Sequence, residues 1–315
     1  MPNITIANLN PCIDWQYNVS SFAHGGLNRV RRTYASAASK GTNVAVVLKN
    51  LGQAPHCVGF NFTDGGDKVV EKFDSLGIEH DLIMIPGAVR VNIKLYEETT
   101  GVMTELNQQG AFVSTEYVCQ LEEKIRNLSN MADADDILVL AGSLPTGVDA
   151  GFYAKLAGIW QGRVFVDVDG DALSLALDEK PYCIKPNIHE LERTFGADGK
   201  LQSPQDVVDF CRNTLNPAPA IVCVSMGAEG AVLVTPNETY FAPAIPVQVR
   251  GVQGAGDSMV AGLVHAAAMG KSNADALRYA MAAAAGSVML DGTELCQRAD
   301  FDMLLANYHL PLWFE

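Results

Sequence analysis

Short, nearly uninterrupted apolar runs that alternate with helical segments constrain the fold of this chain most strongly. The runs lie at 137–141, 164–168 and 221–225. Strands that are apolar on both faces belong to sheets that helices cover on both sides, and such sheets are mostly parallel. The pattern therefore predicts an α/β fold built on a mostly parallel central sheet.

Two regions, at about 12–35 and 88–110, do not fit this alternation. The second holds two β-like stretches with Thr100-Gly101 between them, which is typical of a hairpin turn. We expect these regions to form a small separate sheet within one domain that spans 1–315. Apolar periodicity predicts a first strand at 4–6 and helices at 43–51, 68–76, 115–129, 256–269 and 273–289.

Charge and composition exclude several classes of function. The formal net charge is −14, whereas proteins that bind nucleic acids are normally basic. The seven cysteines form no C-x-x-C pair and the six histidines have no zinc-binding spacing, which is typical of free thiols in a reducing compartment. No apolar run approaches 18 residues and no signal peptide is legible, so we expect a cytoplasmic protein without a membrane partner.

An acidic enzyme that binds anionic substrates needs a local group of cations. Arg29, Arg31, Arg32 and Lys40 lie close together in the sequence, and Arg90 and Lys94 follow later. They are either a phosphate-binding group or a solvated basic surface, and their positions alone do not decide between the two.

The segment Gly254-Ala255-Gly256-Asp257 opens the predicted helix at 256–269. Backbone N–H groups at such a helix start converge on an anion, and an adjacent aspartate could accept a proton from a hydroxyl. Alternatively, Asp257 is only a residue of the first helical turn. A dinucleotide-binding motif is less favoured because it needs a third glycine at Met259.

The segment from Lys185 to Glu190 follows a short strand and opens another helix. Asn187 and Glu190 are three residues apart, so they share a helix face and could hold a hydrated Mg²⁺. The same spacing is typical of a capping box, in which the two side chains bond to each other's backbone N–H. Both interpretations stay open at this point.

Two loops follow strands and could contact a ligand. The first contains Gly142 and Ser143, and by itself indicates only a turn. The second runs from Ser225 to Gly230 at a strand's carboxyl end, which is where ligands bind in open α/β sheets. It is also compatible with a simple hairpin into the apolar run at 231–234.

Taken in order, these motifs resemble the pfkB branch of the ribokinase-like kinases. Within that branch they are similar to the 1-phosphofructokinases and the tagatose-6-phosphate kinases. The segments that carry the resemblance are 8–14, 40–45, 89–94, 142–145, 185–190, 225–230 and 254–257. The resemblance implies a three-layer α/β/α sandwich with a small β-sheet lid, and homodimers that form through the lid.

The resemblance also implies roles for individual residues. Asp257 would take the proton from the accepting hydroxyl, and the amides of Gly254, Ala255 and Gly256 would stabilise the transferred phosphoryl group. The implied ATP-binding residues are Lys185, Asn187, Ser225, Gly227, Gly230 and Gly256, with Mg²⁺ held indirectly by Asn187 and Glu190. The implied sugar-phosphate residues are Asp14, Gly41, Asn43 and Ser143, together with the basic group Arg29, Lys40, Arg90 and Lys94.

The implied reaction is phosphorylation of a ketohexose monophosphate by MgATP to give a bisphosphate. Fructose 1-phosphate is the first expectation, with tagatose 6-phosphate and fructose 6-phosphate as alternatives. A non-catalytic sugar-phosphate sensor is a more remote alternative, which the presence of Asp257 disfavours. The chain departs from the family pattern at Ala38-Ser39, at 251–253, at 59–62 and at 167–170, which leaves the substrate open.

Overall fold

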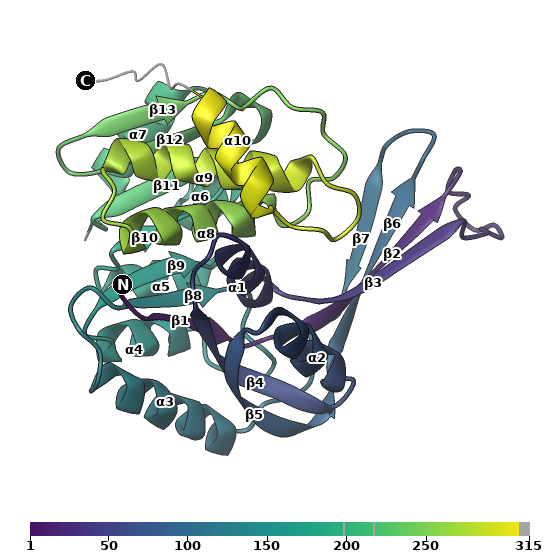
Figure 1. The fold of residues 1–315 in the computed structure, drawn as a ribbon, viewed down its shortest axis with the longest axis horizontal. Helices are drawn as coiled ribbons and strands as arrows, with labels where there is room; N and C mark the ends of the chain where they lie inside the picture. The colour runs from purple at the N-terminus through teal and green to yellow at the C-terminus, as the bar shows by residue number, and fades with distance from the viewer. Residues whose placement is uncertain (198, 217, 309–315) are drawn as a thin grey trace.

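A nine-stranded sheet forms the centre of the computed structural model, which describes residues 1–197, 199–216 and 218–308 (Figure 1). Its strands are β1 (Ile4–Asn8), β4 (Pro55–Asp64), β5 (Glu79–Ala88), β8 (Ile137–Ala141), β9 (Arg163–Asp167), β10 (Cys183–Ile184), β11 (Ile221–Ser225), β12 (Ala231–Val234) and β13 (Thr239–Ala242). The order across the sheet is β13-β12-β11-β10-β9-β8-β1-β4-β5. Every pair from β11 to β5 is parallel, and only β12 and β13 pair antiparallel, so the predicted mostly parallel sheet is confirmed.

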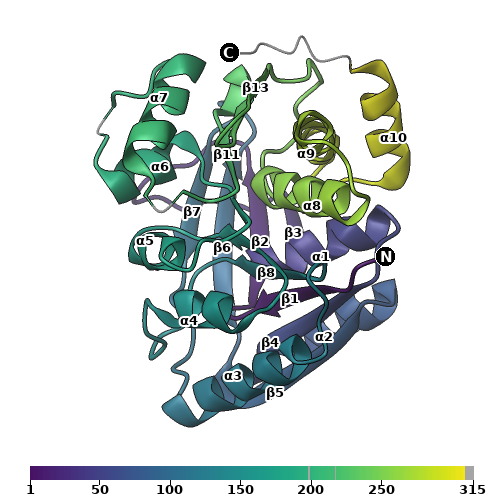
Figure 2. The same ribbon diagram turned by 90° about the vertical axis from the view of Figure 1, so that its left-hand side faces the viewer.

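Helices cover both faces of this sheet (Figure 2). One face carries α1 (Lys40–Asn50), α2 (Asp67–Leu76), α8 (Ala255–Ala268) and α9 (Asn273–Val288), with α10 (Arg298–Asn307) packed on α9. The other carries α3 (Thr115–Ser129), α4 (Phe152–Ile159), α5 (Asp171–Leu177), α6 (Ile188–Phe195) and α7 (Pro204–Thr214). The result is the three-layer α/β/α sandwich that the resemblance implies. No helix in the described part of the chain is long and apolar enough to cross a membrane.

The predicted boundaries differ from the observed ones by a few residues, and the largest shift has a local cause. Helix α1 begins at Lys40 rather than at 43. Ser39 caps it, because its Oγ accepts a hydrogen bond from the backbone N–H of Thr42 at 3.0 Å. The side chain at this departure from the family pattern therefore stabilises the start of a helix.

A second sheet of four strands projects from the side of the body (Figure 1). We call it the lid sheet; its strands are β2 (Cys12–Val19), β3 (Arg32–Ala38), β6 (Arg90–Glu97) and β7 (Met103–Asn107), in the order β3-β2-β6-β7. The small sheet expected at about 12–35 and 88–110 is confirmed, although β3 continues to Ala38. Asp14 lies opposite Asn92, and Asn92 opposite Asn107, so these polar side chains share one face of the sheet.

The packing of α8 against α9 depends on a glycine. A Cβ at Gly262 would lie 2.6 Å from the carbonyl oxygen of Tyr279. We expect Gly262→Ala to lower the free energy of unfolding by about 1–2 kcal/mol in urea titrations, because overpacking outweighs the better helix propensity of alanine. Ala267→Ser, on the same helix and half-buried, should cost only about 0.5 kcal/mol. Equal stability of Gly262→Ala and wild type would contradict this close packing.

Candidate active site

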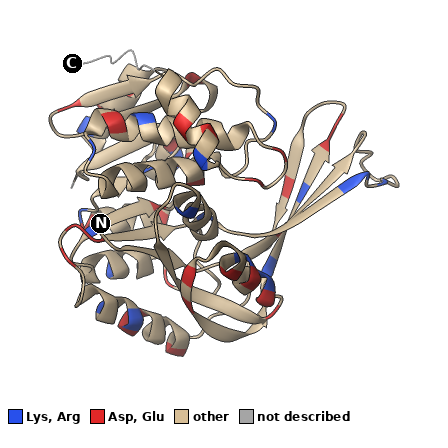
Figure 3. Ribbon diagram, viewed as in Figure 1, with Lys and Arg blue, Asp and Glu red and all other residues tan. Residues whose placement is uncertain are grey.

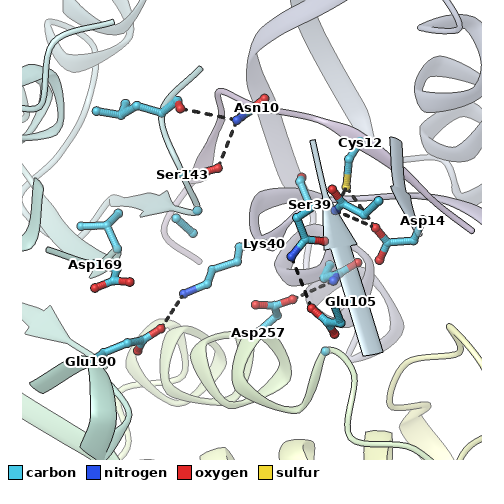
Figure 4. Close-up of a pocket in the computed structure, with 18 of the residues that line it drawn as sticks. Asn10, Cys12, Asp14, Ser39, Lys40, Glu105, Ser143, Asp169, Glu190 and Asp257 are labelled. Atoms are coloured by element: carbon cyan, nitrogen blue, oxygen red, sulfur yellow. Dashed lines mark hydrogen bonds and ion pairs between the residues drawn. The ribbon is translucent and has the colours of Figure 1, made fainter. Parts of the chain in front are cut away.

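A polar cavity of about 940 Å³ lies between the lid sheet and the carboxyl ends of the central strands (Figure 4). Ligands bind at this edge in open α/β sheets. Residues from both sheets and from the starts of α1, α6 and α8 line the cavity. They include ten of the residues predicted from the sequence: Asp14, Lys40, Asn43, Arg90, Lys94, Ser143, Asn187, Glu190, Gly254 and Asp257.

Asp257 lies in the first turn of α8 and is almost fully buried. Its Oδ2 accepts a hydrogen bond of 2.6 Å from Nδ2 of Asn43. The pKa of Asp257 is raised to about 6, because the effects of burial and of the nearby Asp167 carboxylate outweigh the lowering effects of Lys40, Asn43 and Lys185. A carboxylate held by an amide, with a pKa close to neutral pH, is suited to act as a general base.

The backbone before Asp257 requires glycine. Gly254 is the N-cap of α8 with φ +68°, in the left-handed region, and a Cβ there would overlap the side chain of Leu295. Gly254 has no side chain that could accept a hydrogen bond from the first turn. The N–H groups of Ala255, Gly256 and Asp257 therefore remain available to an anion, supported by the helix dipole.

The buried carboxylate of Asp167 lies between two lysines beside this helix start. Its Oδ1 is 3.2 Å from Nζ of Lys40 and 3.3 Å from Nζ of Lys185. Burial alone would raise the pKa of Asp167, but Lys185 and Lys40 hold it below its usual value. For Lys40, burial would lower the pKa, but Asp167, Glu190 and Asp257 raise it above its usual value, so the lysine stays charged.

Sequence reasoning assigned no role to Asp167. A signal was available, because an acidic residue stands near the end of the otherwise apolar run at 164–168. Its importance depends on Lys40, which is 127 positions away in the sequence, and such a contact is not visible in a local pattern.

The lid sheet supplies one wall of the cavity through a network around Asp14. Oδ2 of Asp14 is 2.7 Å from Nζ of Lys94, and its Oδ1 accepts a 3.0 Å hydrogen bond from Asn92. The resemblance places Lys94 in the phosphate-binding group, but here its charge is balanced by Asp14. Sequence reasoning missed Asn92, although its alternation with Arg90 and Lys94 along one strand indicates a shared face.

Arg90 is held by neutral groups rather than by a carboxylate. Its Nε and one terminal nitrogen each donate to the carbonyl oxygen of Asn10 at 3.2 Å, and its other terminal nitrogen donates to Oδ1 of Asn92 at 3.2 Å. Asn10 also donates to Oγ of Ser143 at 3.0 Å, which connects the lid wall to the loop after β8.

A second cavity of about 500 Å³ adjoins the first, and its lining is mostly apolar. Asn187 and Val252 line both cavities. Besides Asn187, five predicted residues line the second cavity: Ser225, Gly227, Gly230, Ala255 and Gly256. The start of α8 thus separates a polar chamber from an apolar one of a size that suits a flat ring system.

The loop after β11 forms the predicted hairpin and is also in a position to contact a ligand. Strands β11 and β12 form an antiparallel hairpin, as the simpler alternative predicts, and the turn between them lines the apolar cavity. Gly230 has φ +118°, and a Cβ there would overlap the carbonyl oxygen of Ala242. The glycine is therefore required by the hairpin itself.

The capping box at the start of α6 is confirmed. Asn187 Oδ1 accepts from the N–H of Glu190, and Glu190 Oε2 accepts from the N–H of Asn187, both at 2.8 Å. The second carboxylate oxygen of Glu190 lies 3.6 Å from Nζ of Lys40. Among the described residues, no group of three or more His, Cys, Asp or Glu side chains could hold a metal ion.

Three predicted residues lie outside the cavity linings. Lys185 is buried, and its Nζ would be 3.6 Å from a Cβ at Gly256, so it lies just beneath the start of α8. Gly41 is buried against Asn8 within α1. Arg29 is exposed on the connection between β2 and β3 and does not line the polar cavity. Its role at a substrate phosphate stays a prediction.

Residues 3–300 match the family described as pfkB family carbohydrate kinase. The chain belongs to this family. It is 31% identical over 302 residues to the 1-phosphofructokinase of Borreliella burgdorferi, covering 95% of each chain. It is 33% identical over 290 residues to the 1-phosphofructokinase of Rhodobacter capsulatus, covering 90% of each. Family membership makes the protein a phosphotransferase that uses ATP as co-substrate and an alcohol group of a carbohydrate as acceptor.

Solved structures agree with the fold. Phosphofructokinase-2 from Escherichia coli superposes with a TM-score of 0.88 at 26% identity, covering 97% of this chain and 99% of that one. Ribokinase from Thermotoga maritima has a TM-score of 0.81 at 21% identity, which supports the fold alone. The ribokinase-like architecture that the sequence resemblance implies is therefore confirmed.

The pKa of Asp257 predicts the pH dependence of this kinase. A general base must be ionised, so we expect kcat/KM to fall about tenfold per pH unit as the pH drops below about 6. Asp257→Asn should lower kcat by roughly 10²-fold or more, because the base is lost. Steady-state rates between pH 4.5 and 8 would measure both.

Asn43→Leu separates titration of Asp257 from titration of a substrate phosphate. It removes the amide that lowers the pKa of Asp257, so the acid limb of the profile should move to higher pH. An acid limb at the same pH in this variant as in the wild type would show that the titration of another group causes it.

Proposed function

We propose that this enzyme phosphorylates fructose 1-phosphate with MgATP to give fructose 1,6-bisphosphate and ADP. The observation that carries the proposal is that Arg90 and Asp257 line one cavity, with the start of α8 between it and the apolar cavity. The arrangement offers a cation for a substrate phosphate, a base for a hydroxyl and an anion-binding helix start for the group in transfer. The names of the similar enzymes from Borreliella burgdorferi and Rhodobacter capsulatus support the choice of substrate.

The phosphoryl transfer follows from the groups at the start of α8. The sugar hydroxyl attacks the γ-phosphorus of ATP, its proton passes to Asp257, and the bond to the β-phosphate oxygen breaks to release ADP. The N–H groups of Ala255 and Gly256, with the ammonium groups of Lys40 and Lys185, would stabilise the phosphoryl charge. All of these groups are fixed before the reaction, so little reorganisation is needed.

The lid wall would hold the sugar phosphate. Asp14, oriented by Lys94 and Asn92, presents its carboxylate to sugar hydroxyls. Arg90 would bind the substrate phosphate through its guanidinium group, whose donors suit paired oxygens. Gly41 would act indirectly, by allowing α1 to pack against Asn8.

The apolar cavity would take the adenosine of ATP, along the turn that contains Ser225, Gly227 and Gly230. The residues present fit Mg²⁺ only in an indirect way, because Asn187 and Glu190 already bond to each other's backbone N–H, and the second Glu190 oxygen lies 3.6 Å from Nζ of Lys40. That oxygen would bind a water of the hydrated ion, while the phosphates supply the other ligands. The ion would neutralise phosphate charge.

We further propose that the chain acts as one kinase domain in the cytoplasm and forms homodimers through the lid sheet. Leu27 is 78% exposed and Leu106 is 61% exposed, and both belong to this sheet or its connections. Apolar side chains in such positions are common at interfaces between subunits. Closure of the lid would exclude water and limit hydrolysis of ATP.

The substrate is tested by measuring ADP release with Mg²⁺ over a panel of acceptors. The panel comprises fructose 1-phosphate, tagatose 6-phosphate, fructose 6-phosphate, the free sugars and a nucleoside. We expect the highest kcat/KM with fructose 1-phosphate. A preference for a 6-phosphate would reassign the enzyme as a tagatose-6-phosphate kinase or a 6-phosphofructokinase. Binding of a sugar phosphate without turnover would favour a sensor.

Arg90→Ala should raise KM for the sugar phosphate by about tenfold or more, because one charge-assisted contact is worth roughly 1.5–3 kcal/mol. The KM for ATP and the unfolding temperature should change little. Arg126→Ala, which removes an exposed arginine paired with Glu122 on α3, is the matched control. An unchanged KM in Arg90→Ala would remove this residue from the phosphate site.

A further inference from the structure

Gln253, which directly precedes Gly254, carries a carboxamide without a hydrogen-bond partner in the described part of the chain. Its Oε1 and Nε2 are both shielded from solvent, and neither has a hydrogen-bond partner among the described residues. Buried amides are normally paired, because an unpaired donor or acceptor destabilises the folded chain. A glutamine in this state calls for a partner from outside the chain.

The side chain lies between two cavities. Gln253 lines the 940 Å³ polar cavity and also a small cavity of about 30 Å³. The small cavity has room for about one water molecule. Asp14, Asn43 and Lys94 line both cavities as well, so the carboxamide is placed among the groups that surround the sugar site.

The neighbours of Gln253 define which part of a substrate it would meet. Asn43 holds the base Asp257, and Asp14 forms the opposite lid wall. In the cavity that these two carboxylates line, Gln253 contributes a group that both donates and accepts hydrogen bonds. Two adjacent sugar hydroxyls, one accepting and one donating, match that group.

We propose that Gln253 determines the specificity of the enzyme for its sugar. When the sugar binds, the carboxamide leaves its shielded position and bonds to the ring hydroxyls between the one that Asp14 binds and the one that Asp257 activates. This rests on the proposed function, because it takes the substrate to be a ketohexose phosphate. Inverting one of these hydroxyls would leave the carboxamide unpaired in the complex, so the enzyme would discriminate between epimers.

A structural role for Gln253 predicts the opposite effect on stability. If the carboxamide served the fold, through a water in the small cavity, an apolar replacement would destabilise the empty enzyme. If it serves the substrate, the same replacement removes an unpaired buried amide and leaves stability unchanged or higher. The sign of the change in unfolding temperature therefore separates the two roles.

Gln253→Met tests the proposal, since methionine has similar length and no amide. Turnover is measured with fructose 1-phosphate and its C3 and C4 epimers, psicose 1-phosphate and tagatose 1-phosphate, and with the corresponding 6-phosphates. We expect kcat/KM for the preferred sugar to fall about tenfold or more, and its preference over the epimers to shrink by a similar factor. The KM for ATP should not change, and the unfolding temperature should stay the same or rise.

Gln53→Met is the matched control. Gln53 is also buried, but its Nε2 lies 2.7 Å from Nδ1 of His265, and it lines neither the polar cavity nor the small one. This variant should have a lower unfolding temperature and an unchanged preference among the sugars. It shows how the loss of a structural glutamine changes the unfolding temperature and the preference among sugars in the same assays.

A lower unfolding temperature of Gln253→Met together with an unchanged preference among epimers would overturn the inference. That result leaves the proposed function intact, because the wild type would still phosphorylate fructose 1-phosphate. Failure of the wild type to use any ketohexose phosphate would instead refute the proposed function and the inference with it.

Discussion

The contact of the Asp167 carboxylate with both Lys40 and Lys185 is the interaction on which the site depends. It joins the end of β9, the start of α1 and the residue after β10 at one point beneath the start of α8. Without the carboxylate, the half-buried ammonium group of Lys40 and the buried one of Lys185 would repel each other. Without the lysines, the pKa of Asp257 would rise further, because Lys40 and Lys185 both lower it.

The start of α8 lies between two cavities. One is polar and bounded by the lid sheet, and the other is apolar and bounded by α8, α9 and the hairpin after β11. In the proposed reaction, the phosphoryl group crosses the boundary between these two cavities. Gly254 makes this possible, because its left-handed backbone turns the chain into the helix and leaves its first N–H groups directed outward.

Local patterns in the sequence were sufficient for the mostly parallel character of the central sheet, for the lid sheet and for the helix start from Gly254 to Asp257. Each is encoded by adjacent residues, through apolar runs, alternation or glycine. The pairing of Lys94 with Asp14 spans 80 positions, and no local pattern reveals it. The shielded amide of Gln253 is likewise a property of the folded chain. Ala38 and Gln253, at two separate departures from the family pattern, line the same small cavity, which only the structure brings together.

Acidic and basic residues are spread over the helices and both sheets, in a chain with a net charge of −14 (Figure 3). Within the polar cavity, Lys94 is paired with Asp14, Lys40 with Asp167 and Glu190, and Arg193 with Asp169. Arg90 lines the same cavity and has no carboxylate partner in the described part of the chain. Among the described cations of this cavity, Arg90 is therefore the one whose charge no carboxylate balances, which supports the proposal that it binds the substrate phosphate on the lid side.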